Sequence, residues 1–277
     1  MHKFKIKECF MILKLFLIVV SVVSLSAKES SWYDNIEVKV EAGMHLADFG
    51  GTHSNSATGY TDYVDDFGYS DAASSYFGLE FDFNYDYIPD IDINYFNVKQ
   101  TKNATLDANK TVEVAAKYEF TNAISSKIDY EVLNVIFHKE MKRKGKRVSF
   151  LRWRPYLGDI AFAVGLNVKI VRWHFRITDD PSPTQPVYKF VNVDEYIPLP
   201  YIKFKYFLYN LTVFGNVSAL SLVDAKSTNY EVGIEYRVMK DLYLVGSYMY
   251  EDFKAVEKKD TIDFKTTGNK FSFKYVF

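Results

Sequence analysis

The most constraining feature of this 277-residue chain is an alternation of apolar and polar side chains that recurs from residue 36 to the last residue. In the segment 36–46, apolar side chains occupy the even positions, and Glu, Lys, Gly and His occupy the odd ones. A helix would mix the two sets on every face, because its period is 3.6 residues, whereas a strand separates them onto opposite faces. The pattern therefore predicts amphipathic β-strands.

The alternation returns in ten segments, joined alternately by short turns near Pro89, Asn210 and Lys240 and by longer polar loops. Short turns on one rim and long loops on the other are typical of transmembrane β-barrels. We therefore predict an all-β fold, a transmembrane antiparallel up-and-down barrel of ten strands, with eight or twelve strands as alternatives. The expected strands cover residues 36–46, 77–85, 91–95, 112–137, 160–170, 202–208, 211–222, 230–238, 242–250 and 271–277.

The first 27 residues have the order of a secretory signal peptide. Three lysines precede an apolar run at residues 11–25, and the small residues Ser26 and Ala27 follow it. An uncleaved anchor helix would need about 20 apolar residues without a charge, and a lysine interrupts this run. We predict a signal peptide at 1–27, directing export through the Sec pathway, and a barrel domain at 28–277.

Composition excludes several classes of function. The only cysteine, Cys9, lies in the predicted signal peptide, so the mature chain would lack disulfides, a cysteine nucleophile and thiolate metal sites. A net charge of -1 gives no reason to expect a nucleic-acid partner. After Ala27 no apolar stretch approaches the length of a membrane helix, so a chain that enters the membrane would have to cross it with strands.

The chain ends on a strand with an aromatic side chain at every second position: Phe271, Phe273, Tyr275 and Phe277. This ending resembles the signal by which outer-membrane barrels of Gram-negative bacteria are recognised by their assembly machinery. A soluble domain has no physical reason to end in this way. The resemblance implies that these four residues form the assembly signal.

Further motifs carry a second resemblance. They are the first-loop segment 61–68 (TDYVDDFG), the turn segment 87–95 (YIPDIDINY), the segment 196–200 (YIPLP) and the closing segment 268–277. In this order they resemble a family of small, largely uncharacterised outer-membrane β-barrel proteins of Gram-negative bacteria. The segment 139–155 departs from that pattern because it is long and basic. The resemblance implies an outer-membrane location and supplies no activity.

If the aromatic face meets lipid, the opposite face lines the lumen. Both signs of charge occur there, and in a narrow barrel such side chains should pair across strands and fill the interior. At the closing seam, for example, Lys270 and Lys274 are expected opposite Glu37 and Glu41. A narrow pore is the alternative. The predicted lumen-facing charges are Glu37, Lys39, Glu41, Glu80, Asp82, Asp92, Lys117, Glu119, Lys203, Lys205, Glu231, Glu235, Arg237 and Lys274.

Two charged segments are candidate binding sites. Asp62, Asp65, Asp66 and Asp71 could hold a divalent cation, but they lack an EF-hand pattern, and we expect a solvated loop without a metal. A basic cluster could bind lipid phosphates beside a membrane, with a solvated turn as the alternative. Its residues are Lys142, Arg143, Lys144, Lys146 and Arg147.

No catalytic or cofactor motif is present. The histidines His45, His53, His138 and His174 lie outside any recognised arrangement, and the chain has no P-loop, dinucleotide fingerprint, HExxH or GxSxG. We therefore predict no enzyme and no cofactor. The expected function is a structural or surface-interacting outer-membrane barrel or a narrow, porin-like pore for small solutes. The alternatives are an outer-membrane hydrolase acting on lipid or peptide and a soluble periplasmic sandwich. Expected partners are outer-membrane lipid and the barrel assembly machinery, and we expect a monomer.

The terminal strand generates the first test. Deleting Phe277 should impair assembly, because the chain would lose the last side chain of its predicted assembly signal. The measurement is the amount of heat-modifiable barrel in outer membranes. Normal insertion of the truncated chain would contradict the membrane prediction.

Overall fold

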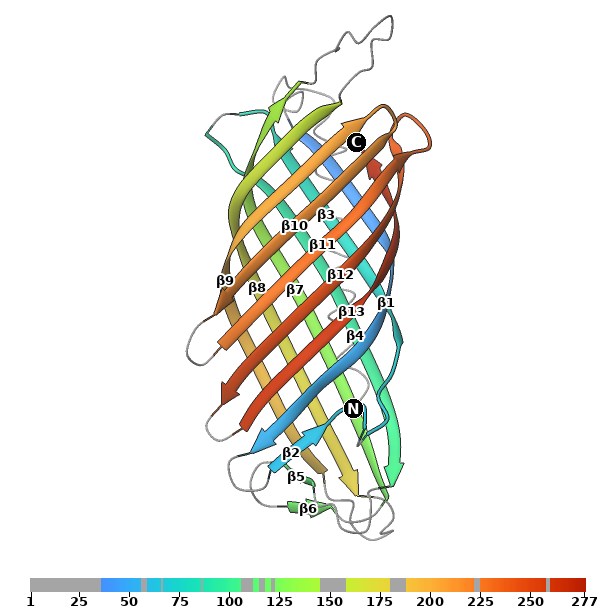
Figure 1. Ribbon diagram of the computed structural model, residues 1–277, viewed down its shortest axis with the longest axis vertical. Coiled ribbons are helices and arrows are strands. Elements are labelled where there is room, and N and C mark those ends of the chain that lie inside the picture. Colours follow the sequence, from blue (N-terminus) through green and yellow to red (C-terminus); the bar gives the residue numbers. More distant parts are fainter. Residues whose placement is uncertain are drawn as a thin grey trace, which may run out of the picture.

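The computed structural model describes residues 36–55, 59–65, 67–85, 87–105, 112–114, 118–120, 123–144, 158–179, 188–221, 225–257 and 260–277. Ten long strands form a closed antiparallel barrel in which the last strand pairs with the first (Figure 1). They are β1 (Ile36–Asn55), β3 (Ala72–Phe83), β4 (Asp90–Thr105), β7 (Ala123–Arg143), β8 (Asp159–Asp179), β9 (Tyr188–Leu208), β10 (Leu211–Ser221), β11 (Ala225–Arg237), β12 (Leu242–Glu257) and β13 (Asp260–Val276). The prediction of a ten-stranded up-and-down barrel is confirmed.

The predicted signal peptide lies outside the described residues. Among the residues that are described, no helix is long and apolar enough to span a membrane.

Three short strands are separate from the ten in the wall. β2 (Gly59–Asp62) pairs with the end of β1, whereas β5 (Val112–Val114) and β6 (Tyr118–Phe120) pair only with each other. The prediction that residues 112–120 begin the fourth wall strand is therefore wrong. β4 is paired along its whole length with β7, up to Thr105 opposite Ala123, so no wall position is left for that segment. Glu119 accordingly lies off the barrel wall, and Lys117 is outside the described residues.

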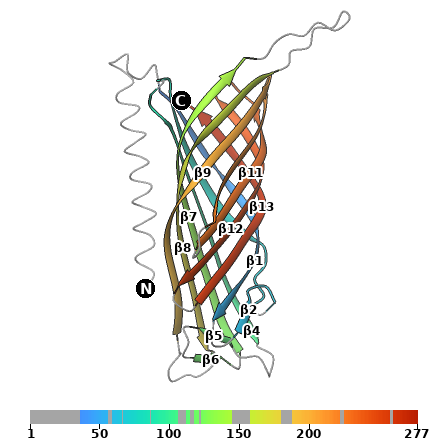
Figure 2. The same cartoon turned by 60° about the vertical axis from the view of Figure 1, so that its left-hand side comes forward.

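The barrel has two unlike rims. The C-terminus and the turns near Pro89, Asn210 and Lys240 lie at one rim, which we call the short-turn rim although the long connection from β7 to β8 is also there, and β2, β5 and β6 lie at the other (Figure 1 and Figure 2). The wall is also uneven in height, because β7, β8 and β9 have 21 residues each and β10 has 11. Pairing of β9 with β10 stops at Tyr201 and Ser218. Before Tyr201, β9 contains Pro198 and Pro200. Proline has no N–H to donate to a neighbouring strand.

Each tall strand exchanges its apolar and polar faces part-way along its length, and β8 shows this most clearly. Between residues 160 and 170 the outward side chains are all apolar, and those of the inner face include Asn167 and Lys169. Beyond residue 170 the outward side chains are Arg172, His174 and Arg176, and the inner face holds residues such as Trp173. The outer surface thus changes from apolar to charged where the interior changes from polar to apolar.

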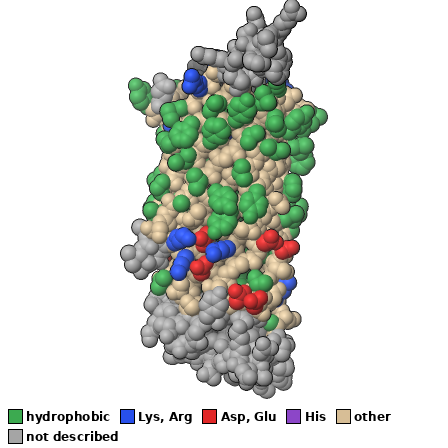
Figure 3. All heavy atoms as spheres, viewed as in Figure 1, with side chains coloured by type: hydrophobic (Ala, Val, Ile, Leu, Met, Phe, Trp, Pro, Cys, Tyr) green, Lys and Arg blue, Asp and Glu red, His purple; other side chains and the backbone are tan. Residues whose placement is uncertain are grey.

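The apolar part of the outer surface has the height of a membrane core. Ten residues at about 3.3 Å each, inclined at about 40°, span about 25 Å. Figure 3 shows hydrophobic side chains spread over the part of the wall nearer the short turns, with basic and acidic side chains gathered below them. We call this part of the surface the apolar belt and the part nearer the long loops the extension.

The extension corrects one expectation. A charged inner face and an apolar outer face hold only within the belt. In the extension the inner face is aromatic and aliphatic, with Tyr130, Trp173 and Phe264 no more than 1% exposed. The physical reason is the solvent: where water surrounds the wall, only an apolar interior can provide the hydrophobic free energy of folding.

The β1–β13 seam generates the second test. A Cβ atom at Gly268 would lie 1.8 Å from the carbonyl oxygen of Leu46, whereas one at Gly246 on neighbouring β12 meets nothing within 4 Å. We expect Gly268→Ala to lower the free energy of unfolding by about 1–3 kcal/mol through overpacking. Gly246→Ala is the matched control and should have little effect. Urea unfolding in detergent micelles measures both, and equal stability of the two variants would contradict the expectation.

Candidate functional site

The first long loop, residues 62–71, turns back into the barrel mouth. The carboxylate Oδ1 of Asp62 accepts hydrogen bonds from the N–H groups of Val64 (2.8 Å) and Asp65 (3.0 Å). The N–H of Tyr63 donates to the carbonyl oxygen of Gly51 at 3.0 Å. Gly68 has a φ of 67°, which a residue with a side chain rarely adopts. These features direct three aromatic side chains of the loop inward.

Those side chains complete an aromatic cluster inside the extension. Tyr63, Phe67 and Tyr69 are at most 1% exposed. Tyr63 lies 5.4 Å from Trp173 and Phe67 lies 5.3 Å from Phe175, measured between ring centroids. We define the aromatic closure as Phe49, Tyr63, Phe67, Tyr69, Phe96, Tyr130, Trp173, Phe175, Phe253 and Phe264.

Two polar contacts fix the loop in this position. The Tyr69 hydroxyl lies 2.9 Å from Ser126 Oγ on β7. The Gln100 amide nitrogen donates to the carbonyl oxygens of Ser70 and Asp71, the second at 3.0 Å. Burial raises the pKa of both Tyr63 and Tyr69 above the ordinary value for tyrosine. Both phenols therefore remain neutral at physiological pH, as a water-excluding core requires.

The expected solvated loop is thus wrong for its aromatic residues. Asp65 and Asp71 are exposed, Asp62 serves the turn, and Asp66 is outside the described residues. The sequence did contain an indication that part of this loop is buried, because the aromatic residues Tyr63, Phe67 and Tyr69 lie among the carboxylates. Nothing local indicated that these rings would have a cavity to enter.

The lumen inside the apolar belt holds the predicted charges. Twelve of the predicted lumen-facing residues lie on the inner face: Glu37, Lys39, Glu41, Glu80, Asp82, Asp92, Lys203, Lys205, Glu231, Glu235, Arg237 and Lys274. Most of them pair across strands. Lys274 Nζ lies 2.6 Å from both Glu80 and Glu235, and Lys270 Nζ lies 2.8 Å from Glu41 and 2.7 Å from Glu231.

These pairs connect into one ladder of alternating charge along the inner faces of β3, β1, β13 and β11. It runs through Lys39, Glu80, Lys274, Glu41, Lys270 and Glu231. Lys274 and Glu41 stand opposite each other at the β1–β13 seam, as expected, and lie 3.6 Å apart. Glu37 instead pairs with Lys39 of its own strand, at 3.0 Å. Pairing offsets the cost of burying charge in a narrow space.

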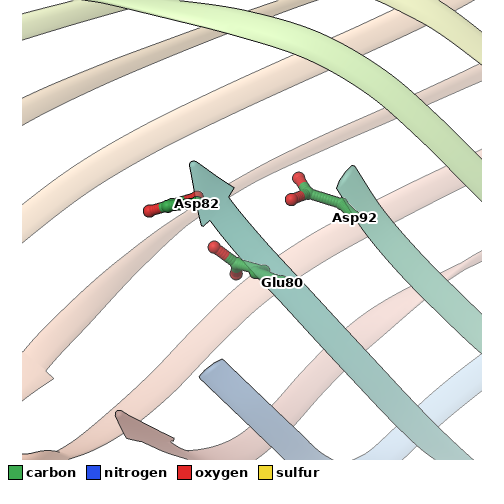
Figure 4. Close-up of side chains that lie close together, drawn as sticks. All are labelled: Glu80, Asp82 and Asp92. Carbon is green, nitrogen blue, oxygen red and sulfur yellow. The ribbon is translucent and has the colours of Figure 1, made fainter. Parts of the chain in front are cut away.

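Three carboxylates inside the apolar belt lie close together (Figure 4). They are Glu80 and Asp82 on β3 and Asp92 on β4, and their oxygens lie within 4.8 Å of one another. Such a group is a candidate ligand set for a divalent cation. Each carboxylate already has an amine partner. Asp82 pairs with Lys39, Asp92 with Lys203 at 2.9 Å and Glu80 with Lys274. A cation would have to displace these ammonium groups, so we interpret the cluster as part of the charge ladder.

A cavity of about 220 Å³ opens at the short-turn rim, and Lys39, Glu80 and Lys274 of the ladder are part of its lining. We call it the vestibule. Polar and charged side chains make up most of its wall: Glu37, Lys39, Glu80, Glu140, Lys142, Lys205, Asn210, Thr212, Glu235, Arg237, Tyr243 and Lys274.

The predicted lipid-phosphate cluster divides at this rim. Lys142 lies on the vestibule side and pairs with Glu140 at 3.2 Å. Arg143 and Lys144 are exposed, and Lys146 and Arg147 lie outside the described residues.

The histidines do not meet in the fold. His45 and His138 are buried in the lumen, where His138 Nε2 lies 3.1 Å from Asp92 Oδ2. His174 is exposed on the outer surface of the extension, and the side chain of His53 is outside the described part. Sequence reasoning missed several buried polar groups, among them Asn134 and Asn167. Another is the ion pair of Lys169 and Glu251, beside Phe253 of the aromatic closure, with Ser227 Oγ 2.8 Å from Lys169 Nζ.

Comparison with known proteins supports the barrel fold and shows no family to which the chain belongs. No protein-family model matches the chain, and no curated protein does. Among solved structures, the outer membrane protease OmpT from Escherichia coli superposes with a TM-score of 0.51 at 9% identity, covering 90% of this chain and 99% of that one. The translocator domain of the autotransporter NalP from Neisseria meningitidis gives 0.38 at 9% identity, covering 97% of each chain. Neisserial surface protein A gives 0.31 at 10% identity, with 87% and 96% covered. At such identities the OmpT match shows a shared barrel fold alone.

The ladder generates the third test. Lys274→Met should lower the free energy of unfolding by about 3–5 kcal/mol, because it leaves buried carboxylates without their amine. The control is Lys265→Met, which removes an exposed lysine of the same strand and should cost about 0–1 kcal/mol. Adding Glu235→Gln to Lys274→Met should restore part of the loss. Urea titration followed by tryptophan fluorescence measures all three, and equal effects of the two lysine substitutions would contradict the ladder's role.

Proposed function

We propose that this protein is an integral barrel of a bacterial outer membrane with a closed lumen, and that it serves as a structural and surface-interacting element rather than as a pore. The single observation that carries the proposal is the aromatic closure formed by the inserted loop 62–71. The apolar belt, which has the height of a membrane core, and the barrel fold shared with OmpT support the membrane location.

Two different seals block the lumen. In the extension the rings of the aromatic closure are in mutual contact and almost fully buried. In the belt the charge ladder lines the inner face from Lys39 to Glu231, and Lys203 on β9 reaches past β8 and β7 to Asp92 on β4 at 2.9 Å. An ion would have to open a packed apolar core and a set of paired buried charges, and both steps are costly.

The extension supplies the surface-interaction part of the proposal. Outer-membrane barrels place their short turns in the periplasm and their long loops outside the cell. On that topology the extension projects beyond the outer leaflet and exposes charged side chains such as Arg172 and Lys254. A rigid wall with a solid core holds such side chains in fixed positions, which favours specific contact with other molecules at the cell surface.

A hydrolase is the less favoured alternative. Among the described residues, Ser227 and Lys169 form a buried serine–lysine pair, and both are 0% exposed. Lys169 is also engaged by Glu251. A substrate could not reach this pair without unfolding the aromatic closure, so we propose no catalytic role for it.

Planar bilayer recording tests the closed lumen. Refolded protein should give no stepwise conductance, because both seals are in place. A variant with residues 63–69 replaced by a Gly-Ser linker should also stay silent, because the charge ladder remains. Heat-modifiable migration of the same samples is the control for insertion. Reproducible conductance steps from the unaltered protein would refute the proposal.

A further inference from the structure

We propose that the vestibule is a binding site for a small zwitterion that carries both a carboxylate and an ammonium group, of the size of an amino acid or short peptide. The inference rests on the distribution of charge in the cavity wall. The charge distribution stands without the proposed function, whereas the closed inner end of the vestibule rests on it.

Three cations of the vestibule wall, Lys142, Lys205 and Arg237, have few carboxylate partners. Lys142 and Lys205 share a single carboxylate, Glu140, at 3.2 Å each. The Arg237 guanidinium binds the amide oxygen of Asn210, with Nη2 at 2.8 Å. No described carboxylate lies within 4.0 Å of Arg237. Three cations therefore have one anion among them, which favours an incoming carboxylate.

Three carboxylates of the wall share two ammonium groups. Glu37 and Glu80 both pair with Lys39, which also binds Asp82 outside the cavity lining. Glu235 shares Lys274 with Glu80. The side chain of Glu37 is 48% exposed and borders the cavity, so it can accept a further ammonium group. A simple anion would satisfy only the cations of the wall and would be repelled by these carboxylates.

The size and depth of the vestibule restrict the ligand further. A cavity of about 220 Å³ is smaller than the roughly 300–1,000 Å³ of sites for drug-sized molecules. Thr212 and Tyr243 add neutral hydroxyl groups to its lining. The charge ladder and the aromatic closure block the inner end, so a solute must leave by the mouth through which it entered. These features describe a binding pocket rather than an entrance to a pathway.

Isothermal titration calorimetry on the full-length protein refolded in detergent tests the site, with L-alanyl-L-alanine as the probe. We expect saturable binding of the dipeptide and none of its N-acetylated, C-amidated form, which has the same shape without charges. Arg237→Gln and Glu37→Gln should each weaken binding by about tenfold or more, because each removes a charged hydrogen-bonding partner. Arg172→Gln, on the outer surface of the extension, is the matched control and should bind as the unaltered protein does.

Four results would overturn the inference. The first three are no saturable binding of the dipeptide, equal binding of the capped form, and unchanged affinity in both Arg237→Gln and Glu37→Gln. Both substituted residues are exposed at the rim, and heat-modifiable migration verifies that each variant has folded. If inorganic phosphate competes with the dipeptide and Glu37→Gln has no effect, the site is an anion site and the zwitterion is refuted. Failure of binding would leave the bilayer recordings unchanged, so the two proposals can fail separately.

Discussion

The constraint on which the structure depends is the pairing of backbone N–H and C=O groups in a region where water cannot reach them. Within a membrane an open sheet edge would leave a row of such groups unsatisfied, so a spanning sheet must close on itself. The β1–β13 seam provides this closure over residues 39–55 and 260–276. Gly43 and Gly268 lie where the opposing backbones approach too closely for a side chain. The alternating pattern, the uneven rims and the enclosed lumen all follow from that closure.

Two solvents then act on one continuous wall. In the belt, lipid surrounds the barrel and the interior receives the charges, which pair because the lumen is narrow. In the extension, water surrounds the barrel and the interior becomes an apolar core. β8 shows the exchange within a few residues, from Lys169 facing inward to Arg172 facing outward. The same strand is thus a membrane strand at one end and a strand of a water-soluble barrel at the other. This arrangement fills the extension with rings and the belt with ion pairs, and a vestibule remains among the described residues at the short-turn rim.

Much of the fold was accessible from the sequence because a strand's period of two is a local property. The ten segments, the short turns and the inward position of residues such as Glu80, Lys203 and Lys274 follow from counting positions. Two expectations failed because they depended on what lies across the barrel. Residues 112–120 alternate as a wall strand does, but they do not join the wall because β7 pairs with the whole length of β4. Tyr63, Phe67 and Tyr69 belong to a polar loop in sequence, yet the open end of an apolar interior offered them burial.

The sequence by itself determined that this chain forms strands with opposite faces, that its charges face a common interior within the belt, and that its last strand is aromatic. Period and composition act through neighbouring residues, so no partner is needed to infer them. Tertiary structure alone decided which carboxylate meets which lysine, where the two faces exchange, that the first loop enters the barrel, and that a cavity of two-sided charge remains at one mouth. Each of these depends on distances between strands far apart in the chain, which only the closed barrel sets.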